Sequence, residues 1–145
     1  MIPRVGEAIR RGVKYTRRPG AYAVLERDGH VLLTHQMEPE PEFQLPGGGI
    51  DPGEHPISAL HREIYEETGW RVSGFRRLGA FRRFTYMPEY DLWAEKICQV
   101  FYGRPTLRLG DPLEPGHTAH WVPPRIAAEM VGNDGDRHFL TKVFG

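Results

Sequence analysis

The sequence predicts one layered domain of the α/β or α+β class. Its 145 residues fit a single domain of ordinary size, and 39% hydrophobic with 26% charged residues is typical of a globular chain. Segments rich in β-branched and aromatic residues are interspersed with a few helical segments. Because strands mixed with a few helices pack in layers around one core, residues 1–145 are predicted to form a single domain.

The N-terminal third is predicted to hold an arm or short helix, a hairpin and a short strand. Residues 1–18 are polar and basic with apolar residues at roughly helical spacing, which suits either a helix or an extended arm. The Arg27-Asp28-Gly29 segment separates two apolar runs, at 21–25 and 30–34, and is a strong hairpin signal. Prolines make 38–42 a loop, and a strand at 43–45 is expected to stop at Pro46-Gly47-Gly48-Gly49.

The rest of the chain begins with the most clearly bounded element. A helix is predicted from Pro56, which suits a first helical position, to about Thr68, with Gly69 as its stop. Longer strands are expected at 75–86 and 92–102, a short strand at 120–122 and a short helix near 125–130. A final helix carries its apolar residues on one face: Phe139, Leu140, Val143 and Phe144.

Composition and charge argue against several classes of protein. The formal net charge is zero, so the chain lacks the overall basic field expected of a general nucleic-acid binder. Arginine pairs such as Arg17-Arg18 and Arg82-Arg83 hint at an anionic ligand, although a GC-rich coding sequence explains them equally well. Cys98 lies among apolar residues and is predicted to be a small core residue. No apolar run is long enough for a membrane span and no signal-like segment begins the chain, which predicts a cytoplasmic protein.

The helix predicted over 56–68 carries three glutamates on one face. Glu63, Glu66 and Glu67 are neighbours at spacing i, i+3, i+4. Exposed like charges at these spacings repel by roughly 0.2–0.5 kcal/mol per pair, and the helix dipole disfavours negative charge in the last turn. A hard divalent cation with oxygen ligands would relieve both penalties, whereas a solvated acidic helix end is the alternative. An adjacent stripe is predicted to face the core: Ile57, Leu60 and Ile64.

Residues around the three glutamates suggest supporting roles. Arg62 lies four residues before Glu66 and can brace it in an ion pair. Glu54 precedes the helix N-terminus, where it suits either a capping role or that of a metal ligand or proton acceptor. A run of glycines permits positive φ and close backbone approach to a ligand, although an ordinary tight turn is the alternative. The run consists of Gly47, Gly48 and Gly49.

The segment from Gly48 to Trp70 resembles the Nudix box, and Leu45-Pro46-Gly47-Gly48 is similar to the family's lead-in. Trp70 departs from the usual aliphatic residue but stays apolar. The resemblance implies an α/β/α sandwich with a mixed β-sheet, in which the box forms a loop–helix–loop. The fixed positions of the box are all filled, by Gly48, Glu54, Arg62, Glu63, Glu66, Glu67 and Gly69.

The resemblance also implies roles for individual residues. Mg²⁺ or Mn²⁺ would be bound by Glu63, Glu66 and Glu67, while Arg62 would orient a glutamate. Glu54 would assist, and Gly48 would shape the loop. Family members often recruit a further carboxylate from outside the box, for which the candidates in order are Glu114 and Glu95, with His117 as a substitute proton acceptor.

The expected activity is Mg²⁺-dependent hydrolysis of a diphosphate bond by attack of water on phosphorus. The substrate would be a small-molecule nucleoside diphosphate derivative, with arginines holding its phosphates. A nucleotide-binding sensor on the same fold is the main alternative, and an interaction module with an accidental acidic helix is remote. Many relatives dimerise, so a homodimer is possible. Phe43, Phe84 and Tyr86 are candidates to stack on a nucleobase, and Tyr86 and Pro88 match conflicting substrate markers.

Overall fold

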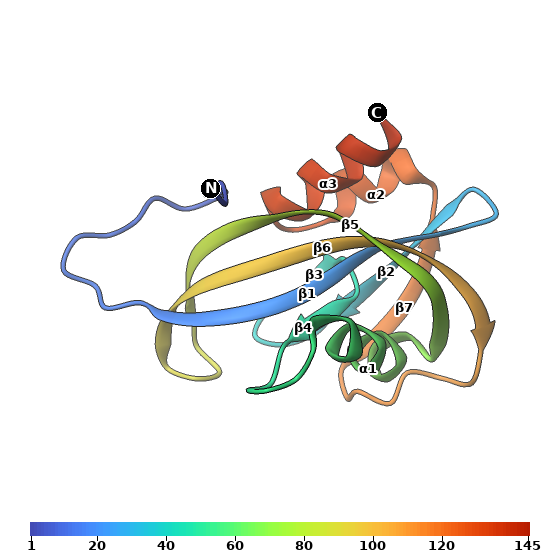
Figure 1. Ribbon diagram of the computed structural model, residues 1–145, viewed down its shortest axis with the longest axis horizontal. Coiled ribbons are helices and arrows are strands. Elements are labelled where there is room, and N and C mark those ends of the chain that lie inside the picture. Colours follow the sequence, from blue (N-terminus) through green and yellow to red (C-terminus); the bar gives the residue numbers. More distant parts are fainter.

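The computed structural model describes residues 1–145, which form seven strands and three helices (Figure 1). In chain order these are β1 (Thr16–Arg27), β2 (His30–Gln36), β3 (Glu42–Gln44), β4 (Gly47–Gly49), α1 (Pro56–Thr68), β5 (Trp70–Met87), β6 (Leu92–Arg108), β7 (His117–Val122), α2 (Pro124–Met130) and α3 (Asp134–Phe144).

The strands form one mixed sheet between helical layers. The main strand order is β3-β2-β1-β6-β5, with β4 paired to β1 and β7 paired to β2. The β1–β6 pair is parallel and the other pairs are antiparallel. Figure 1 shows α1 on one face of the sheet and α2 with α3 on the other. The α/β/α sandwich with a mixed sheet is therefore confirmed.

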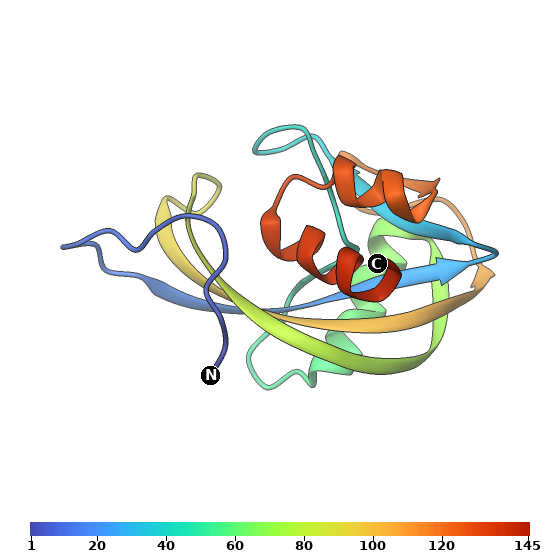
Figure 2. The same cartoon turned by 90° about the horizontal axis from the view of Figure 1, so that it is seen from above.

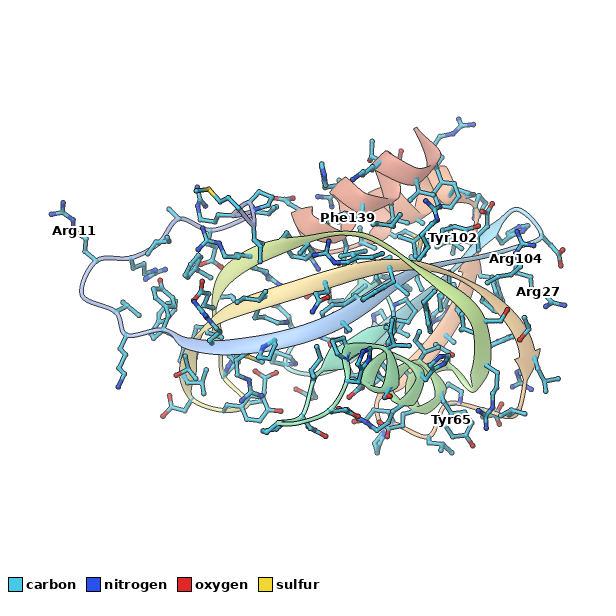
Figure 3. All side chains as sticks on the ribbon, in the orientation of Figure 1. Arg11, Arg27, Tyr65, Tyr102, Arg104 and Phe139 are labelled. Atoms are coloured by element: carbon cyan, nitrogen blue, oxygen red, sulfur yellow. The ribbon has the colours of Figure 1, made fainter.

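Two apolar clusters bind the layers together. Alternate residues of β1 point to opposite faces, so Leu25 packs in the cluster of α1 while Val24 packs in the cluster of α3. Leu60 and Ile64 are fully buried, which confirms most of the predicted stripe. On the other face Phe139 joins α3 to the sheet (Figure 3).

The local signals for turns and helix ends are confirmed. Asp28 and Gly29 have φ values of 51° and 76°, the two positive values that a tight hairpin of this kind requires. Helix α1 begins at Pro56 and ends at Thr68, and Gly69 stops it with φ 76°. Cys98 is buried as expected, and burial raises the pKa of its thiol to about 12.

At the N-terminus one of the two expected alternatives is found, and one segment differs from the expectation. The first fifteen residues contain no helix and form the arm, which lies along the edge of β5 through hydrogen bonds from Val5 N to Arg82 O (2.9 Å) and from Arg82 N to Pro3 O (2.8 Å) (Figure 2). Gly6 and Gly12 both have positive φ, which interrupts helical geometry. The run Gly47–Gly49 was expected only to end the preceding strand. It forms strand β4 instead, because it pairs with β1.

None of the three helices combines the length and the apolar character that crossing a lipid bilayer requires.

Candidate active site

The glycine run and the end of α1 are joined through Glu67. This side chain is buried, with a residue exposure of 5%, and its Oε1 accepts a hydrogen bond from Gly47 N at 3.0 Å. Gly47 has φ 144°, and a Cβ at this position would overlap the carbonyl oxygen of Ala21 on β1. Only glycine allows β4 to approach β1 this closely, and that approach brings the backbone N–H to the carboxylate.

Gly48 faces the second glutamate of the box. A Cβ on Gly48 would lie 2.6 Å from the Glu63 carboxyl carbon, so the missing side chain leaves room for that carboxylate. Gly49 has open space at the corresponding position. The three glycines therefore differ: Gly47 has both the positive φ and the close approach that the sequence indicated, whereas Gly48 leaves room for a carboxylate.

Arg62 connects the loop before α1 to the helix. Its Nε and Nη2 donate to the two carboxylate oxygens of Glu54, both at 2.9 Å, and its Nη1 donates to Glu63 at 2.8 Å. The predicted brace of Glu66 is weaker, because the closest atoms of that pair are 3.7 Å apart. The guanidinium group of Arg62 instead binds both carboxylate oxygens of Glu54. Residue spacing within the helix could not predict this pair, because Glu54 lies in the loop before the helix.

Glu54 does not cap α1. The cap is His55, whose ring accepts a hydrogen bond from Ile57 N at 3.1 Å. Glu54 also accepts from Asp51 N at 3.0 Å. The hydrogen bonds from Arg62 and from this backbone N–H lower the pKa of Glu54 to about 2, so it is a poor proton acceptor.

The carboxylates of the helix crowd one another. Burial raises the pKa of Glu67 well above its ordinary value, and the charges of Glu63, Glu114 and Glu66 raise it further. Burial also raises the pKa of Glu63, against the lowering effect of Arg62. No three acidic, histidine or cysteine side chains are arranged as a ready-made metal-binding group. The donor set nevertheless consists of carboxylate oxygens, which are the ligands that Mg²⁺ prefers.

The loop before β7 brings two candidates from outside the box to this site. Backbone N–H groups of Leu113 and Glu114 donate to the Glu66 carbonyl oxygen at 2.7 and 2.9 Å, so the loop is docked on the end of α1. At the start of β7, His117 Nε2 lies 3.7 Å from Glu67 Oε2. Both Glu114 and His117 are thus placed beside the box glutamates.

Glu95 lies elsewhere. Its carboxylate pairs with Arg17 at 3.5 Å and with Arg82 at 3.4 Å. It therefore neutralises two arginines, and it does not line the pocket that holds Glu63 and Glu67. The sequence left its strand face undecided, and the β1–β6 register places it away from the box.

Two of the box glutamates, Glu63 and Glu67, border a pocket of about 320 Å³. Its walls include the three glycines, Glu63, Glu67 and His117. The walls also include residues that sequence reasoning did not assign to the site, among them Arg18, Tyr22 and Lys96 of β1 and β6. The Arg17-Arg18 pair was the one available signal, because the parallel pairing that brings Lys96 alongside Arg18 is not encoded locally.

The aromatic candidates for base stacking have different environments. Phe84 is buried, with its ring 4.9 Å from Tyr15 of the arm, so it belongs to the core. Phe43 packs against the cluster that includes α3. Tyr86 is exposed near the β5–β6 turn, where its ring lies 5.2 Å from Trp93 and its hydroxyl donates to Asp91.

Known proteins share parts of this sequence. The chain is 43% identical over 82 residues to an RNA pyrophosphohydrolase of Cereibacter sphaeroides, which covers 56% of this chain and 49% of that one. It is 40% identical over 58 residues to diphosphoinositol polyphosphate phosphohydrolase 3-alpha of Mus musculus, covering 40% and 35% of the two chains. The chain therefore spans about half or less of the length of these curated relatives.

Solved structures share its fold. A NUDIX hydrolase from Nitrosomonas europaea superposes with a TM-score of 0.72 at 21% identity, covering 88% of each chain. The MutT protein from Methanosarcina mazei Go1 gives 0.70 at 21% identity, covering 90% of this chain and 95% of that one. The family model described as NUDIX domain matches residues 14–143. Since this match covers nearly the whole chain and the complete box occupies the loop and helix beside the pocket, the protein belongs to the Nudix hydrolase family.

Proposed function

We propose that this protein is a divalent-metal-dependent hydrolase that cleaves the diphosphate bond of a nucleoside diphosphate linked to another moiety. The observation that carries the proposal is the burial of Glu67 beside Glu63 in a pocket that also receives basic residues. Burying neighbouring carboxylates is costly unless a cation offsets their charge. A pocket with acidic and basic walls suits a cation together with phosphate groups.

Mg²⁺, or Mn²⁺ in its place, would be held by Glu63, Glu66 and Glu67, and Glu114, whose backbone is docked on the end of α1, is the further candidate. When bound, such a cation neutralises phosphate charge and lowers the pKa of coordinated water. Arg62 keeps Glu63 oriented through its hydrogen bond. The glycine run keeps this side of the pocket free of side chains.

Proton acceptance is assigned to the carboxylates near the pocket, namely Glu63, Glu67 and Glu114, rather than to Glu54. Both oxygens of Glu54 are occupied by the Arg62 fork, so Glu54 acts as a brace for the loop. His117 lies next to Glu67 and is suited to orient it. A base placed in this way typically contributes 10²–10⁴-fold to the rate.

The names of the relatives favour this reaction class. One is named an RNA pyrophosphohydrolase and another a diphosphoinositol polyphosphate phosphohydrolase. Both names describe hydrolysis at a diphosphate linkage. The substrate proposed for this chain is a small nucleotide that contains such a diphosphate linkage.

Substitution of Glu67 by glutamine tests the proposal. Glu67→Gln keeps the shape of the side chain and removes its charge, so kcat is expected to fall by at least ~10²-fold. The assay is a substrate panel with Mg²⁺ and with EDTA that resolves phosphate, pyrophosphate and nucleoside monophosphate products. Thermal melting would show that the variant is folded.

The matched control is Glu129→Gln, which removes a charge from an exposed position on α2. It should keep the activity of the wild type. Wild-type turnover by Glu67→Gln would refute the role of Glu67. Tight nucleotide binding without turnover of any substrate would favour the sensor instead.

A further inference from the structure

Residues 45–47, the crossing segment, carry the chain from one group of strands to another. Strand β3 pairs with β2 and ends at Gln44, whereas β4 begins at Gly47 and pairs with β1. Leu45 lies outside both of these strands and is fully buried. A buried backbone N–H group without an acceptor is costly, so the Leu45 N–H needs a partner from another part of the fold.

Helix α3 supplies that acceptor. Asp136 is buried, and its Oδ2 accepts a hydrogen bond from Leu45 N at 3.1 Å. Asn133 caps α3 by accepting from Asp136 N at 2.8 Å. Gly135 lets the first turn approach β5, because a Cβ at this position would overlap the Phe81 ring. The cap and the close approach of α3 together fix the position of Asp136.

The crossing segment has two backbone N–H groups, because Pro46 has none. Both are donated to buried carboxyl groups. Leu45 N donates to Asp136 of α3. Gly47 N donates to Glu67 of α1 at 3.0 Å. Since α1 and α3 lie on opposite faces of the sheet (Figure 1), the crossing segment connects an acidic side chain of one layer to a box glutamate of the other.

The crossing segment has little freedom to move between these two contacts. A proline ring restricts φ to about −65°, and the carbonyl oxygen of Pro46 accepts a hydrogen bond from Ala23 N of β1 at 2.9 Å. The Leu45 side chain is packed in the core cluster that includes Phe139 of α3. Two residues of chain span roughly 7 Å at most, so a shift of Leu45 is passed on to the N–H of Gly47.

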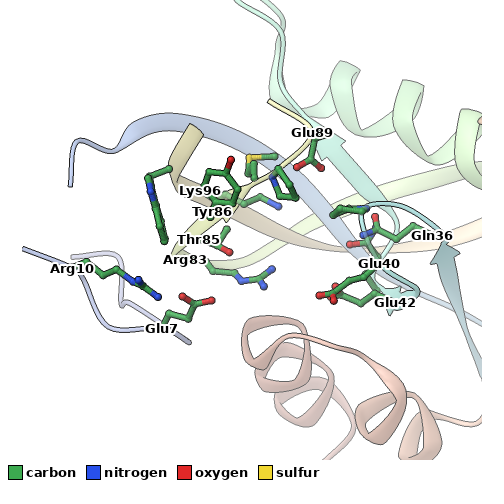
Figure 4. A pocket seen from close by; sticks show the side chains of 15 residues that line it. Glu7, Arg10, Gln36, Glu40, Glu42, Arg83, Thr85, Tyr86, Glu89 and Lys96 are labelled. Atoms are coloured by element: carbon green, nitrogen blue, oxygen red, sulfur yellow. The ribbon is translucent and has the colours of Figure 1, made fainter. Parts of the chain in front are cut away.

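Asp136 lies outside the proposed active site. It lines neither the pocket of Glu63 and Glu67 nor the neighbouring polar recess of about 480 Å³ (Figure 4). Burial raises the pKa of its carboxyl group to about 6, and among the nearby charges Lys96 lowers this pKa while Glu42 raises it. Both of these side chains line the recess in Figure 4. Any influence of Asp136 on the reaction is therefore indirect.

We propose that Asp136 is a positioning residue for Glu67. By holding Leu45 N, it keeps the Gly47 N–H on Oε1 of Glu67 and so fixes the direction in which this carboxylate is turned. Small displacements of a metal-binding or catalytic group are costly, because the reaction requires a closely held geometry. The catalytic consequence rests on the proposed function, whereas the link between Asp136 and Gly47 does not depend on it.

Removal of the acceptor tests the catalytic consequence. For Asp136→Ala, kcat is expected to fall at least ~10-fold with KM changed less than ~2-fold, because no side chain of the pocket is removed. Asp136→Asn removes the charge but keeps an oxygen for Leu45 N, so it should retain most of the wild-type kcat. Asp134→Ala, at an exposed position in the same turn, is the control and should match the wild type. An equal loss of kcat in Asp136→Asn and Asp136→Ala would overturn the hydrogen-bonded route.

Amide hydrogen exchange followed by NMR tests the link itself, without any substrate. In Asp136→Ala the protection of the Gly47 amide should fall at least ~10-fold more than that of the Leu60 amide in the middle of α1, which reports a loss of global stability. In Asp136→Asn the two amides should change alike. Unchanged relative protection of Gly47, or wild-type kcat despite its loss, would overturn the positioning role.

Melting curves show which variants are folded. If Asp136→Ala is unfolded, Asp136→Ser takes its place in both experiments, because the serine hydroxyl is one bond shorter than the carboxylate that Leu45 N requires. Absence of turnover by the wild type with every substrate would refute the proposed function, while the exchange result would still decide the link between Asp136 and Gly47.

Discussion

At the scale of single residues, the site depends on glycines that leave space for neighbouring side chains. Gly48 has no Cβ where one would collide with Glu63, whereas Gly49 faces open space. The two glycines are adjacent in the same short strand, and neither has a positive φ that would strain another residue. They therefore offer a matched pair for testing whether the position of Glu63 matters.

Gly48→Ala is expected to displace Glu63 and to lower kcat by about 10- to 100-fold, since small misplacements of a catalytic group are costly. The measurement is kcat under saturating substrate and Mg²⁺, with a urea titration to compare stability. Gly49→Ala should keep the activity of the wild type. An equal loss of activity in both variants would show that β4 tolerates no side chain, and would remove the argument for Glu63.

At the scale of elements, helix α3 is tied to the segment between β3 and the glycine run. Asp136, in the first turn of α3, is buried, and its Oδ2 accepts a hydrogen bond from Leu45 N at 3.1 Å. Burial raises the pKa of Asp136 to about 6, against the lowering effect of that hydrogen bond. The contact holds α3 against the segment that leads into β4.

The raised pKa makes stability depend on pH. The folded protein binds the Asp136 proton more tightly than the unfolded chain, whose value is near 3.8. The free energy of unfolding should therefore fall as pH rises from about 4 to about 6, by up to about 3 kcal/mol from this group. Urea titrations at several pH values would measure the slope.

Asp136→Asn removes the titrating group and keeps an oxygen that can accept from Leu45 N. Its stability should fall less steeply over the same pH range. Asp134→Asn, an exposed neighbour in the same turn, is the control and should keep the slope of the wild type. Identical pH profiles for all three proteins would contradict the assignment.

Other elements show what could be predicted locally. The bounds of α1 and the β1–β2 hairpin were predicted from proline, glycine and Asp-Gly signals, which act through the backbone of a few residues. The sequence left a helix and an arm as alternatives for the first residues. The arm forms because two glycines with positive φ interrupt helical geometry, although the apolar residues have helical spacing. The long strands β5 and β6 exceed their predicted lengths because each stabilises the ends of the other.

At the scale of the whole molecule, binding of a cation should be visible as stability. A ligand that binds only the folded state stabilises it by mass action, by about 2.7 kcal/mol at one hundred times its Kd. Adding Mg²⁺ should raise the melting temperature of the wild type and of Glu129→Gln. The increase should be smaller in Glu67→Gln, which lacks one proposed ligand.

The rise in melting temperature on adding Mg²⁺ is measured for each variant against the same variant without Mg²⁺, because removal of a buried charge can itself change stability. NaCl at matched ionic strength controls for screening of surface charges. The same increase in all three proteins would mean that Mg²⁺ acts away from the box glutamates.

The sequence by itself determined the bounds of α1 and the positions of its glutamates and of the glycine run before it. These features are local, and their spacing along one helix is enough to place the carboxylates together. It also determined the family, because the fixed positions of the box lie within a single short segment. The partner of Arg62 was less predictable, since Glu54 reaches it only after the loop has folded back.

Only the tertiary structure decided what faces the box. Arg18 and Lys96 are far apart in the chain, and the pairing of β1 with β6 brings both to the pocket that holds Glu63 and Glu67. The register between distant strands depends on how both faces of the sheet are buried, which no short window of sequence contains. For the same reason the sequence could not tell which of Glu114 and Glu95 lies near the box. Glu114 docks on the end of α1, whereas Glu95 pairs with arginines elsewhere.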